Sequence, residues 1–381
     1  MNRADAKNSE ISSDPKFALN ILVARPDRLG DVLLSTPVFS VLKKHYPHAR
    51  ITALVRDPVV SVLKGLSSID DILVFDPERK HAGVRGFFTL MEEIRNRNFQ
   101  ISVVLQSHLK VAAALYGAGV PNRLGPLGKP HSYFFYNRGV RQRRSQVEMH
   151  ETDYNLQLLR KLGIRPLSRV ISTEAHVSEG ALAYSRVWLE NQGISLEKSP
   201  DKRKLIIVHP GMGGSALNWP EKHYLDLIRA LLKEKHQVLV TGGPTEGPLL
   251  KRIQDELATS AEKPFFYGGP GTGTVDYLAG LMTYADLIIA PSTGPLHLAV
   301  ALGKPVVSFY PPVRVQSAIR WGPYMTDETK ASVLVPEVYC GQDFNCIGSL
   351  CNYHPCMKSL TVNQALEQVR LQLARHIDLL P

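Results

Sequence analysis

The apolar residues of this chain gather in short continuous runs, and amphipathic or polar segments separate the runs. Residues 19–24 (LNILVA) predict a buried strand, and residues 25–30 form a polar loop after it. Residues 31–45 then repeat apolar positions at the i, i+4, i+7, i+8 spacing of one helix face, at Leu34, Val38, Val41 and Leu42. Residues 50–55 predict the next strand, so the chain opens with strand, loop, helix and strand.

The second half of the chain begins in the same order. Residues 204–209 (KLIIVH) predict a strand, and residues 210–214 (PGMGG) form a glycine-rich loop. Pro220 suits the first turn of a helix whose apolar face consists of Tyr224, Ile228, Leu231 and Leu232. Residues 237–241 predict the following strand.

The strands in both halves are apolar throughout and do not alternate in polarity. Continuous apolar strands joined by helices indicate parallel sheets that are covered on both faces. We therefore predict an α/β protein with two doubly wound, Rossmann-like domains. Further strands are predicted at 72–75, 101–105, 286–290 and 305–309.

The same patterns predict the domain boundaries. The N-terminal domain spans 17–175, a linker follows at 176–203, and the C-terminal domain spans 204–360. A last helix is expected within 361–381, because Thr361 and Gln364 have the spacing of a capping box. This helix could pack back on the N-terminal domain.

Charge is distributed unevenly along the 381 residues. Residues 1–175 hold 26 Lys+Arg and 16 Asp+Glu, and residues 176–381 hold 19 of each, so the net charge of +10 belongs to the first half. This asymmetry predicts an anionic partner such as nucleic acid, a phosphorylated glycolipid or an acidic membrane surface, although simple solubility is an alternative. Nucleic acid is the weaker candidate, since no zinc-finger spacing, helix-turn-helix pattern or basic strand with interleaved aromatics occurs.

Composition excludes several classes of protein. With 44% hydrophobic and 21% charged residues, the chain is not disordered, collagenous or dense in disulfides. Residues 1–16 are polar, so we expect neither a signal peptide nor a membrane anchor there. The apolar stretch 287–303 is broken by two prolines within 291–295, and we expect no transmembrane segment.

Ligands of doubly wound sheets bind at the carboxyl ends of the strands, and three loops there carry candidate chemistry. The first contains Gly211, Gly213, Gly214 and Ser215. Glycines let a ligand approach the backbone, whose N–H groups can hold phosphate. The loop matches neither the P-loop nor the dinucleotide fingerprint, and an ordinary tight turn is an equal alternative.

The second loop lies between a predicted strand and helix at 292–299 (STGPLHLA). Ser292 or Thr293 can cap this helix, whose N–H groups and positive dipole end would suit a diphosphate. His297 could reach the same oxygens. The alternative is an ordinary capped helix with a partly buried histidine.

The third loop, at 25–31 (RPDRLGD), ends with Asp31 at the start of a helix. The helix dipole keeps a carboxylate there ionised, and an ionised carboxylate beside a cleft between domains can act as a general base. Asp31 could instead only cap the helix, and Asp27 is a rival for the role of base.

These residues also carry a family resemblance. Residues 28–37 (RLGDVLLSTP) resemble the amino-terminal signature of the family 9 glycosyltransferases, the bacterial heptosyltransferases. Residues 210–220, 242–246, 292–297 and 351–357 are similar to later motifs of that family, in the same order. The resemblance covers roughly residues 19–375.

The resemblance implies a GT-B fold, with two doubly wound Rossmann-like domains and a cleft between them. It implies inverting, metal-independent transfer of heptose from ADP-heptose to an inner-core acceptor of lipopolysaccharide, without a cofactor, at the inner face of the cytoplasmic membrane. It places the catalytic aspartate at Asp31, and the donor contacts at Gly211, Gly213, Gly214, Ser215, Glu246, Ser292, Thr293, Gly294 and His297. The basic first half would face the anionic acceptor, with Arg28, Arg56, Arg138 and Arg141 as candidate contacts.

The chemistry of the residues agrees with that activity. A diphosphate leaving group requires positive potential rather than an acid, and two helix amino ends with the glycine loop can supply it. Two positions depart from the family pattern: Leu217 or Asn218 stands where a lysine is common, and Ser292 where an aspartate is common. A different nucleotide sugar or surface glycan, an epimerase, or a non-catalytic binding relative therefore remain alternatives.

Four cysteines lie close together in the sequence, at Cys340, Cys346, Cys351 and Cys356. They could be structural thiols, a tetrahedral metal site or disulfides; the spacing lacks C-x2-C, and a cytoplasmic location disfavours disulfides. Trp219 is expected to be a packing residue, and His209 a hydrogen-bonded wall residue. Residues 133–136 (YFFY) precede an arginine cluster and could form an apolar tip that touches a membrane.

Overall fold

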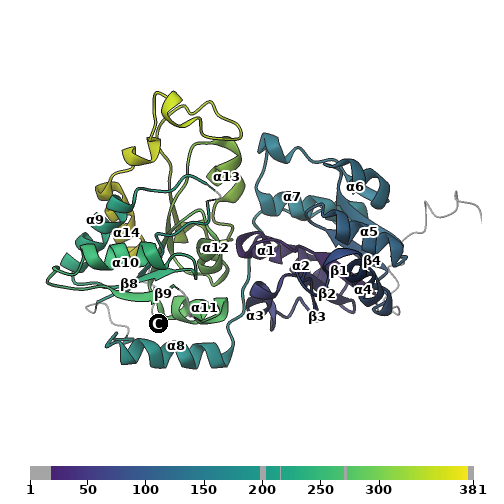
Figure 1. Cartoon of the computed structure of the whole chain (residues 1–381), viewed down its shortest axis with the longest axis horizontal. Coiled ribbons are helices and arrows are strands. Elements are labelled where there is room, and N and C mark those ends of the chain that lie inside the picture. The colour runs from purple at the N-terminus through teal and green to yellow at the C-terminus, as the bar shows by residue number, and fades with distance from the viewer. Residues whose placement is uncertain (1–18, 198–202, 215, 270–272, 376–381) are drawn as a thin grey trace, which may run out of the picture.

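The computed structural model describes residues 19–197, 203–214, 216–269 and 273–375. These residues form two parallel sheets, each covered by helices (Figure 1). The N-terminal sheet has the order β3-β2-β1-β4-β5-β6. Its strands are β1 (Asn20–Ala24), β2 (Arg50–Val55), β3 (Asp71–Val74), β4 (Ile101–Val104), β5 (Asn122–Pro126) and β6 (Arg138–Val140).

The C-terminal sheet has the order β12-β11-β10-β7-β8-β9, which repeats the N-terminal arrangement. Its strands are β7 (Leu205–Val208), β8 (Gln237–Gly242), β9 (Phe265–Gly268), β10 (Leu287–Pro291), β11 (Val306–Phe309) and β12 (Ala331–Leu334). The strand order reverses between β1 and β4 in one sheet and between β7 and β10 in the other. The prediction of two doubly wound α/β domains is confirmed, and each reversal marks the place where such sheets bind ligands.

The central strands are largely apolar because both faces of each sheet are buried there. Ile21 and Val23 of β1 pack in one hydrophobic cluster, while Leu22 and Ala24 pack in another on the opposite face. The strands of the C-terminal sheet are divided between two clusters in the same way. The continuous runs in the sequence therefore follow from helices that cover both faces.

Seven α-helices of the described chain belong to the N-terminal domain: α1 (Leu29–Leu33), α2 (Thr36–His45), α3 (Val60–Leu63), α4 (Gly83–Asn96), α5 (Leu109–Gly117), α6 (Pro130–Phe135) and α7 (Glu151–Gln157). The prediction of one helix over 31–45 is wrong, since the chain forms α1 and α2 with a break at Leu34 and Ser35. Pro37 has no N–H to donate to Leu33, and the hydroxyl of Thr36 donates to that carbonyl at 2.7 Å instead.

The C-terminal domain holds α8 (Glu179–Asn191), α9 (Glu221–Lys233), α10 (Gly247–Glu256), α11 (Val275–Tyr284), α12 (Gly294–Ala301), α13 (Ala318–Trp321) and α14 (Val362–Arg375). Helix α8, which the sequence places in the linker, packs on α11. Ser178 fixes its start, because the hydroxyl accepts from the N–H of Ala181 and donates to Asp276 at 2.7 Å.

Helix α14 packs on α9 and on β10, β11 and β12. The expectation that it returns to the N-terminal domain is therefore wrong, because its buried residues Ala365, Leu366 and Val369 join the core of the C-terminal domain. The capping box is present: the N–H of Thr361 donates to Gln364 at 2.8 Å, and the N–H of Gln364 donates back to the Thr361 hydroxyl at 3.2 Å.

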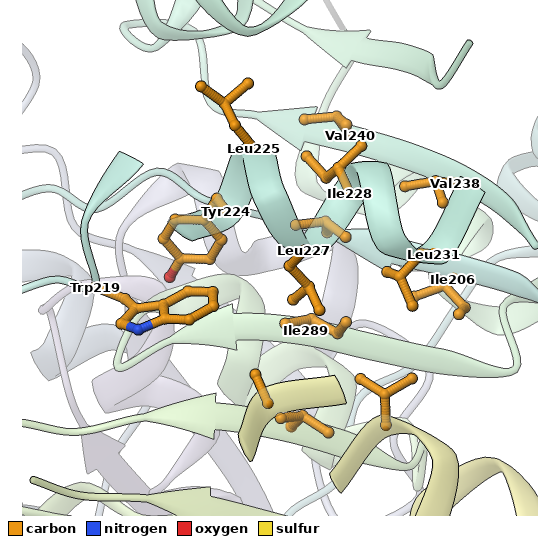
Figure 2. Packing of buried hydrophobic residues seen from close by; sticks show 14 of the residues in the cluster. Ile206, Trp219, Tyr224, Leu225, Leu227, Ile228, Leu231, Val238, Val240 and Ile289 are labelled. Atoms are coloured by element: carbon orange, nitrogen blue, oxygen red, sulfur yellow. The ribbon is translucent and has the colours of Figure 1, made fainter. Parts of the chain in front are cut away.

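Trp219 packs beside Tyr224 at the start of α9 (Figure 2), in the same hydrophobic cluster as Leu360 before α14. Its ring stacks on Phe309 with centroids 4.2 Å apart and meets Tyr224 edge to face. Its Nε1–H donates to the carbonyl of Leu360 at 2.8 Å, and the side chain is 2% exposed. Trp219 is thus a packing residue, as predicted.

We expect Trp219→Ala to lower the free energy of unfolding by about 3–5 kcal/mol, because it opens a cavity in a packed core. Trp219→Phe keeps most of the ring contacts and should lower the free energy of unfolding markedly less. Urea unfolding of both variants checks this. A loss below about 1 kcal/mol for the alanine variant would show that Trp219 does not stabilise this core.

Candidate active site

A cavity of about 490 Å³ lies where the two domains face each other. The N-terminal domain contributes Arg28, Gly30 and Asp31 from the loop after β1 and the start of α1. The C-terminal domain contributes residues 292–295 and His297 from the loop after β10 and from α12, together with Arg320 of α13. Two of the three loops singled out in the sequence therefore meet around one cavity.

Close contact between α1 and α12 creates this arrangement (Figure 1). A Cβ atom on Gly30 would lie 2.7 Å from Cδ2 of His297 and 3.6 Å from the Cα of Gly294. A Cβ on Gly294 would lie 3.3 Å from the Cβ of Leu29. The two glycines thus let the helices approach closely, and Asp31 comes to face the amino end of α12 across the cavity.

The amino end of α12 is not capped by a side chain. Thr293 occupies the N-cap position with extended φ and ψ of −148° and 166°, but it makes no side-chain cap hydrogen bond. The sequence expectation of a Ser292 or Thr293 cap is therefore wrong. The positive end of the helix dipole and the first N–H groups are left to interact with the cavity.

Asp31 is held by a buried arginine. Arg25 follows β1, is 1% exposed and donates from Nη2 to Oδ1 of Asp31 at 2.7 Å. Burial lowers the pKa of Arg25, but Asp31, Glu151 and Asp27 outweigh it, so that the net pKa is raised. Asp31 therefore faces a permanent positive charge, and its side chain remains 24% exposed.

Asp27, the rival candidate, is placed differently. It forms an ion pair with Nε of Arg25 at 2.9 Å and does not line the cavity. Burial raises the pKa of Asp27, and Arg25 opposes this only in part. The geometry thus favours Asp31 for chemistry within the cavity.

His297 lines the cavity but is almost fully buried, and its ring is neutral. The side chain is 5% exposed, and Nδ1 is buried without a hydrogen-bond partner in the described part of the chain. Burial lowers the pKa of His297 to about 4, although Asp31 acts in the opposite direction. At neutral pH the ring is therefore uncharged, and it lies beside Gly30.

Glu151, at the start of α7, joins the two domains, and nothing in the sequence had singled it out. Its carboxylate is fully buried and binds Arg25 and Arg144 through Oε1. Its Oε2 accepts from Nε and Nη2 of Arg320, both at 3.2 Å. Burial raises the pKa of Glu151, but the three arginines outweigh it and the net pKa is lowered.

His150 strengthens the same contact. Its Nδ1 accepts from the N–H of Thr152 at 3.1 Å, so Nε2 carries the proton and donates to the carbonyl of Gly322 at 2.9 Å. Burial lowers the pKa of His150 to about 3. The start of α7 therefore binds residues 320–322 of the other domain.

The glycine loop and Glu246 form a second group at the ends of β7 and β8. Oε2 of Glu246 accepts from the N–H of Gly243 at 2.6 Å, and a Cβ on Gly211 would lie 2.1 Å from Cδ of Glu246. Gly213 and Gly214 are exposed, Ser215 lies outside the described residues, and the neighbouring Ala216 lines the cavity. His209 is a buried wall residue, as expected, with Nδ1 3.0 Å from the Thr241 hydroxyl.

The four candidate acceptor arginines do not lie together. Arg28 lines the cavity, and Arg56 follows β2 and pairs with Glu78. Arg141 follows β6 and donates to the Tyr133 hydroxyl at 3.3 Å. Arg138 begins β6 and donates to Asn122 at the start of β5, which places it at the amino edge of the sheet, away from the cavity.

The four cysteines are free thiols in the segment between β12 and α14, and they line one small pocket. The N–H of Gly348 donates to Sγ of Cys346 at 3.3 Å, and burial together with the other three cysteines raises the pKa of the Cys356 thiol. Within the described residues, no group of three or more His, Cys, Asp or Glu is arranged to hold a metal ion. None of the helices described is long and apolar enough to span a membrane.

Sequence comparison points to one enzyme family. The sequence profile of glycosyltransferase family 9 (heptosyltransferase) matches residues 87–352. A Haemophilus influenzae protein with the provisional name of a glycosyltransferase is 33% identical over 312 residues, which cover 80% of this chain and 85% of that protein.

Solved structures share the fold. A family 9 glycosyl transferase of Veillonella parvula superposes with a TM-score of 0.82 at 21% identity, covering 94% of this chain and 99% of that one. The ADP-heptose lipopolysaccharide heptosyltransferase II of Escherichia coli superposes with a TM-score of 0.73 at 21% identity, again covering 94% and 99%.

The two buried neutral histidines predict a pH dependence of stability. Their folded pKa values lie below the usual 6.5, so the unfolded chain binds more protons at low pH and their stabilisation is lost as pH falls from about 6.5 toward 4. Each contributes about 1.4 kcal/mol per pH unit in that range. Urea unfolding at pH 7.5 and 5.0 should therefore show a smaller acid loss for His150→Gln than for the wild type.

His48→Gln is the matched control, since His48 is exposed. It should lose as much stability on acidification as the wild type. Equal losses for all three proteins would mean that the folded structure does not lower the pKa of His150.

Proposed function

The chain belongs to glycosyltransferase family 9, the heptosyltransferase family, and on that premise we propose that it transfers heptose from ADP-heptose to an inner-core acceptor of lipopolysaccharide. The reaction proposed is an inverting displacement that uses Asp31 as general base and no metal. One observation carries the proposal: the contact of α1 with α12 places a carboxylate and an uncapped helix amino end on opposite sides of one cavity.

Asp31 has the surroundings that a general base requires. It would accept the proton of an acceptor hydroxyl while that oxygen attacks the anomeric carbon from the face opposite the leaving diphosphate. The new carbon–oxygen bond forms as the bond to the β-phosphate oxygen breaks, so the configuration inverts. Arg25 orients the Asp31 carboxylate by donating to its Oδ1 at 2.7 Å.

The donor is proposed to lie against the C-terminal domain. Negative charge on the departing diphosphate would be stabilised by the amino end of α12, formed by Ser292, Thr293 and Gly294. Glu246, next to Gly211 and Gly243, offers carboxylate oxygens to the hydroxyls of the nucleoside ribose. Because helix dipoles and arginines supply the positive potential, the proposal includes no metal.

The acceptor and the membrane are proposed to meet the N-terminal domain. Arg28 lines the cavity, and Arg56 and Arg141 follow β2 and β6 at the carboxyl edge of the same sheet. Tyr116 of α5 and Phe134 of α6 are 49% and 68% exposed, with ring centroids 5.6 Å apart. Aromatic and basic side chains together suit an anionic bilayer surface, which would place the enzyme at the cytoplasmic face of the inner membrane.

Asp31→Asn should lower kcat for heptose transfer by about 10²–10⁴-fold, because it removes the proton acceptor. ADP affinity should stay within about twofold. Asp27→Asn, the control at the other carboxylate on Arg25, should lower kcat by less than about tenfold, since Asp27 does not line the cavity. Transfer from ADP-heptose to deacylated lipopolysaccharide core measures kcat, and calorimetric titration measures ADP affinity.

Wild-type turnover by the Asp31 variant would remove this residue from the role of base, and a larger loss in the Asp27 variant would assign the role to Asp27. Transfer from another nucleotide sugar, or product formed without acceptor, would contradict the proposed substrates.

Phe134→Asp should weaken binding to vesicles of phosphatidylglycerol and phosphatidylethanolamine several-fold, since it places a negative charge in the exposed aromatic pair. Tyr339→Asp is the control, because Tyr339 is 87% exposed on the other domain and should bind as the wild type does. Co-sedimentation measures the bound fraction. A wild-type protein that stays in the supernatant would refute the membrane contact.

A further inference from the structure

Two arginines line the cavity between the domains, and they come from opposite sides. Arg28 belongs to the N-terminal domain, and Arg320 belongs to α13 of the C-terminal domain, which also carries the uncapped end of α12. The sequence offered no cation on the donor side, because Leu217 and Asn218 occupy the position where one was expected. Asn218 instead donates to the carbonyl of Pro210 at 2.8 Å, within its own loop.

Arg320 is held in a defined orientation. Nε and Nη2 both donate to Oε2 of Glu151 at 3.2 Å, and the guanidinium carbon lies 4.7 Å from the centroid of the Trp321 ring. The side chain is 16% exposed, and Nη1 has no hydrogen-bond partner within the described residues. A guanidinium fixed through two nitrogens can present the third to a ligand with little further loss of conformational entropy.

Arg320 also keeps positive potential for a ligand. Glu151 also pairs with Arg25 and Arg144, so its single negative charge neutralises the charge of Arg320 only in part. The negative charges of Asp27 and Asp31 are directed at Arg25, on the other side of Glu151. Arg320 is therefore the cationic side chain that the C-terminal domain contributes to the cavity lining.

We propose that Arg320 binds the diphosphate of the nucleotide sugar and stabilises the negative charge that develops when the sugar departs. This inference rests on the proposed function and assigns a donor contact that lies outside the motifs of the sequence. When the bond between the anomeric carbon and the β-phosphate oxygen breaks, the electron pair stays on the phosphate. A fixed N–H donor beside the amino end of α12 then interacts more strongly with the products than with the substrate.

Because Glu151 reaches Arg320 from the N-terminal domain, the contact depends on the two domains being together. Arg25, on the same carboxylate, holds Asp31. The buried carboxylate of Glu151 thus supports both Arg320, which would bind the donor, and Arg25, which orients the proposed base Asp31. Arg320 is a binding residue in this account, and Glu151 is a positioning residue.

Calorimetric titration with ADP and with AMP tests the proposal, because the two ligands differ by the β-phosphate. Arg320→Gln should weaken ADP binding about tenfold to hundredfold, the usual loss for a charged hydrogen bond, and leave AMP binding within about twofold. Arg320→Lys should weaken ADP binding less than Arg320→Gln does. Arg314→Gln is the matched control, since Arg314 is half exposed nearby, pairs with Asp343 and does not line the cavity.

The outcomes separate this inference from the proposed function. Arg320→Gln is expected to fold, because Glu151 keeps Arg25 and Arg144, and its melting temperature checks this. Equal weakening of ADP and AMP, or unchanged ADP binding, overturns the role of Arg320 while the proposed function stands. A wild-type protein that binds none of ADP, UDP and GDP overturns the proposed function and this inference with it.

Discussion

The close approach of α1 to α12 is the constraint on which the candidate active site depends. Gly30 and Gly294 leave no side chain between the two helices, and the ring of His297 fills the remaining space. Without this contact, Asp31 and the loop after β10 would belong to two separate sheet edges. With it, the ligand-binding edges of two doubly wound domains form a single cavity.

A buried charge cluster supports this contact from behind. Arg25, Arg144 and Arg320 surround Glu151, while Asp27 and Asp31 bind the far side of Arg25. Removing Glu151, the shared member, would leave buried arginines without this carboxylate, which is far more destabilising than the modest net contribution of an intact pair. The cluster therefore specifies one relative placement of the domains, and that placement serves the chemistry proposed for Asp31.

The proposed roles of the two domains, acceptor binding and donor binding, follow from their composition as well as from their fold. The charge excess of the chain belongs to residues 1–175, whereas the second half is neutral overall. A nucleotide held by a helix end and one arginine needs only local positive potential, while a phosphorylated acceptor or membrane surface responds to the field of a whole domain. Under the proposed function, the local positive potential for the nucleotide and the positive field of the basic domain lie on opposite sides of the same cavity.

Local pattern was enough to predict the two doubly wound sheets and the capping box at Thr361, because each depends on neighbours within a few residues or on burial of a whole strand. The packing role of Trp219 was also predicted, although its partners Phe309 and Leu360 are distant in the sequence. Local pattern also marked Asp31 and residues 292–297, since helix starts after apolar strands are visible in the sequence. Local pattern failed where contacts between distant segments determine the structure. It missed the helix break before Thr36, the packing of α14 on the C-terminal domain and the sheet edge on which Arg138 lies. Above all, it missed the contact of Glu151 with Arg320, which are separated by 169 residues. Two residues that far apart share no periodicity, and their contact exists only once both sheets have formed and their edges face each other.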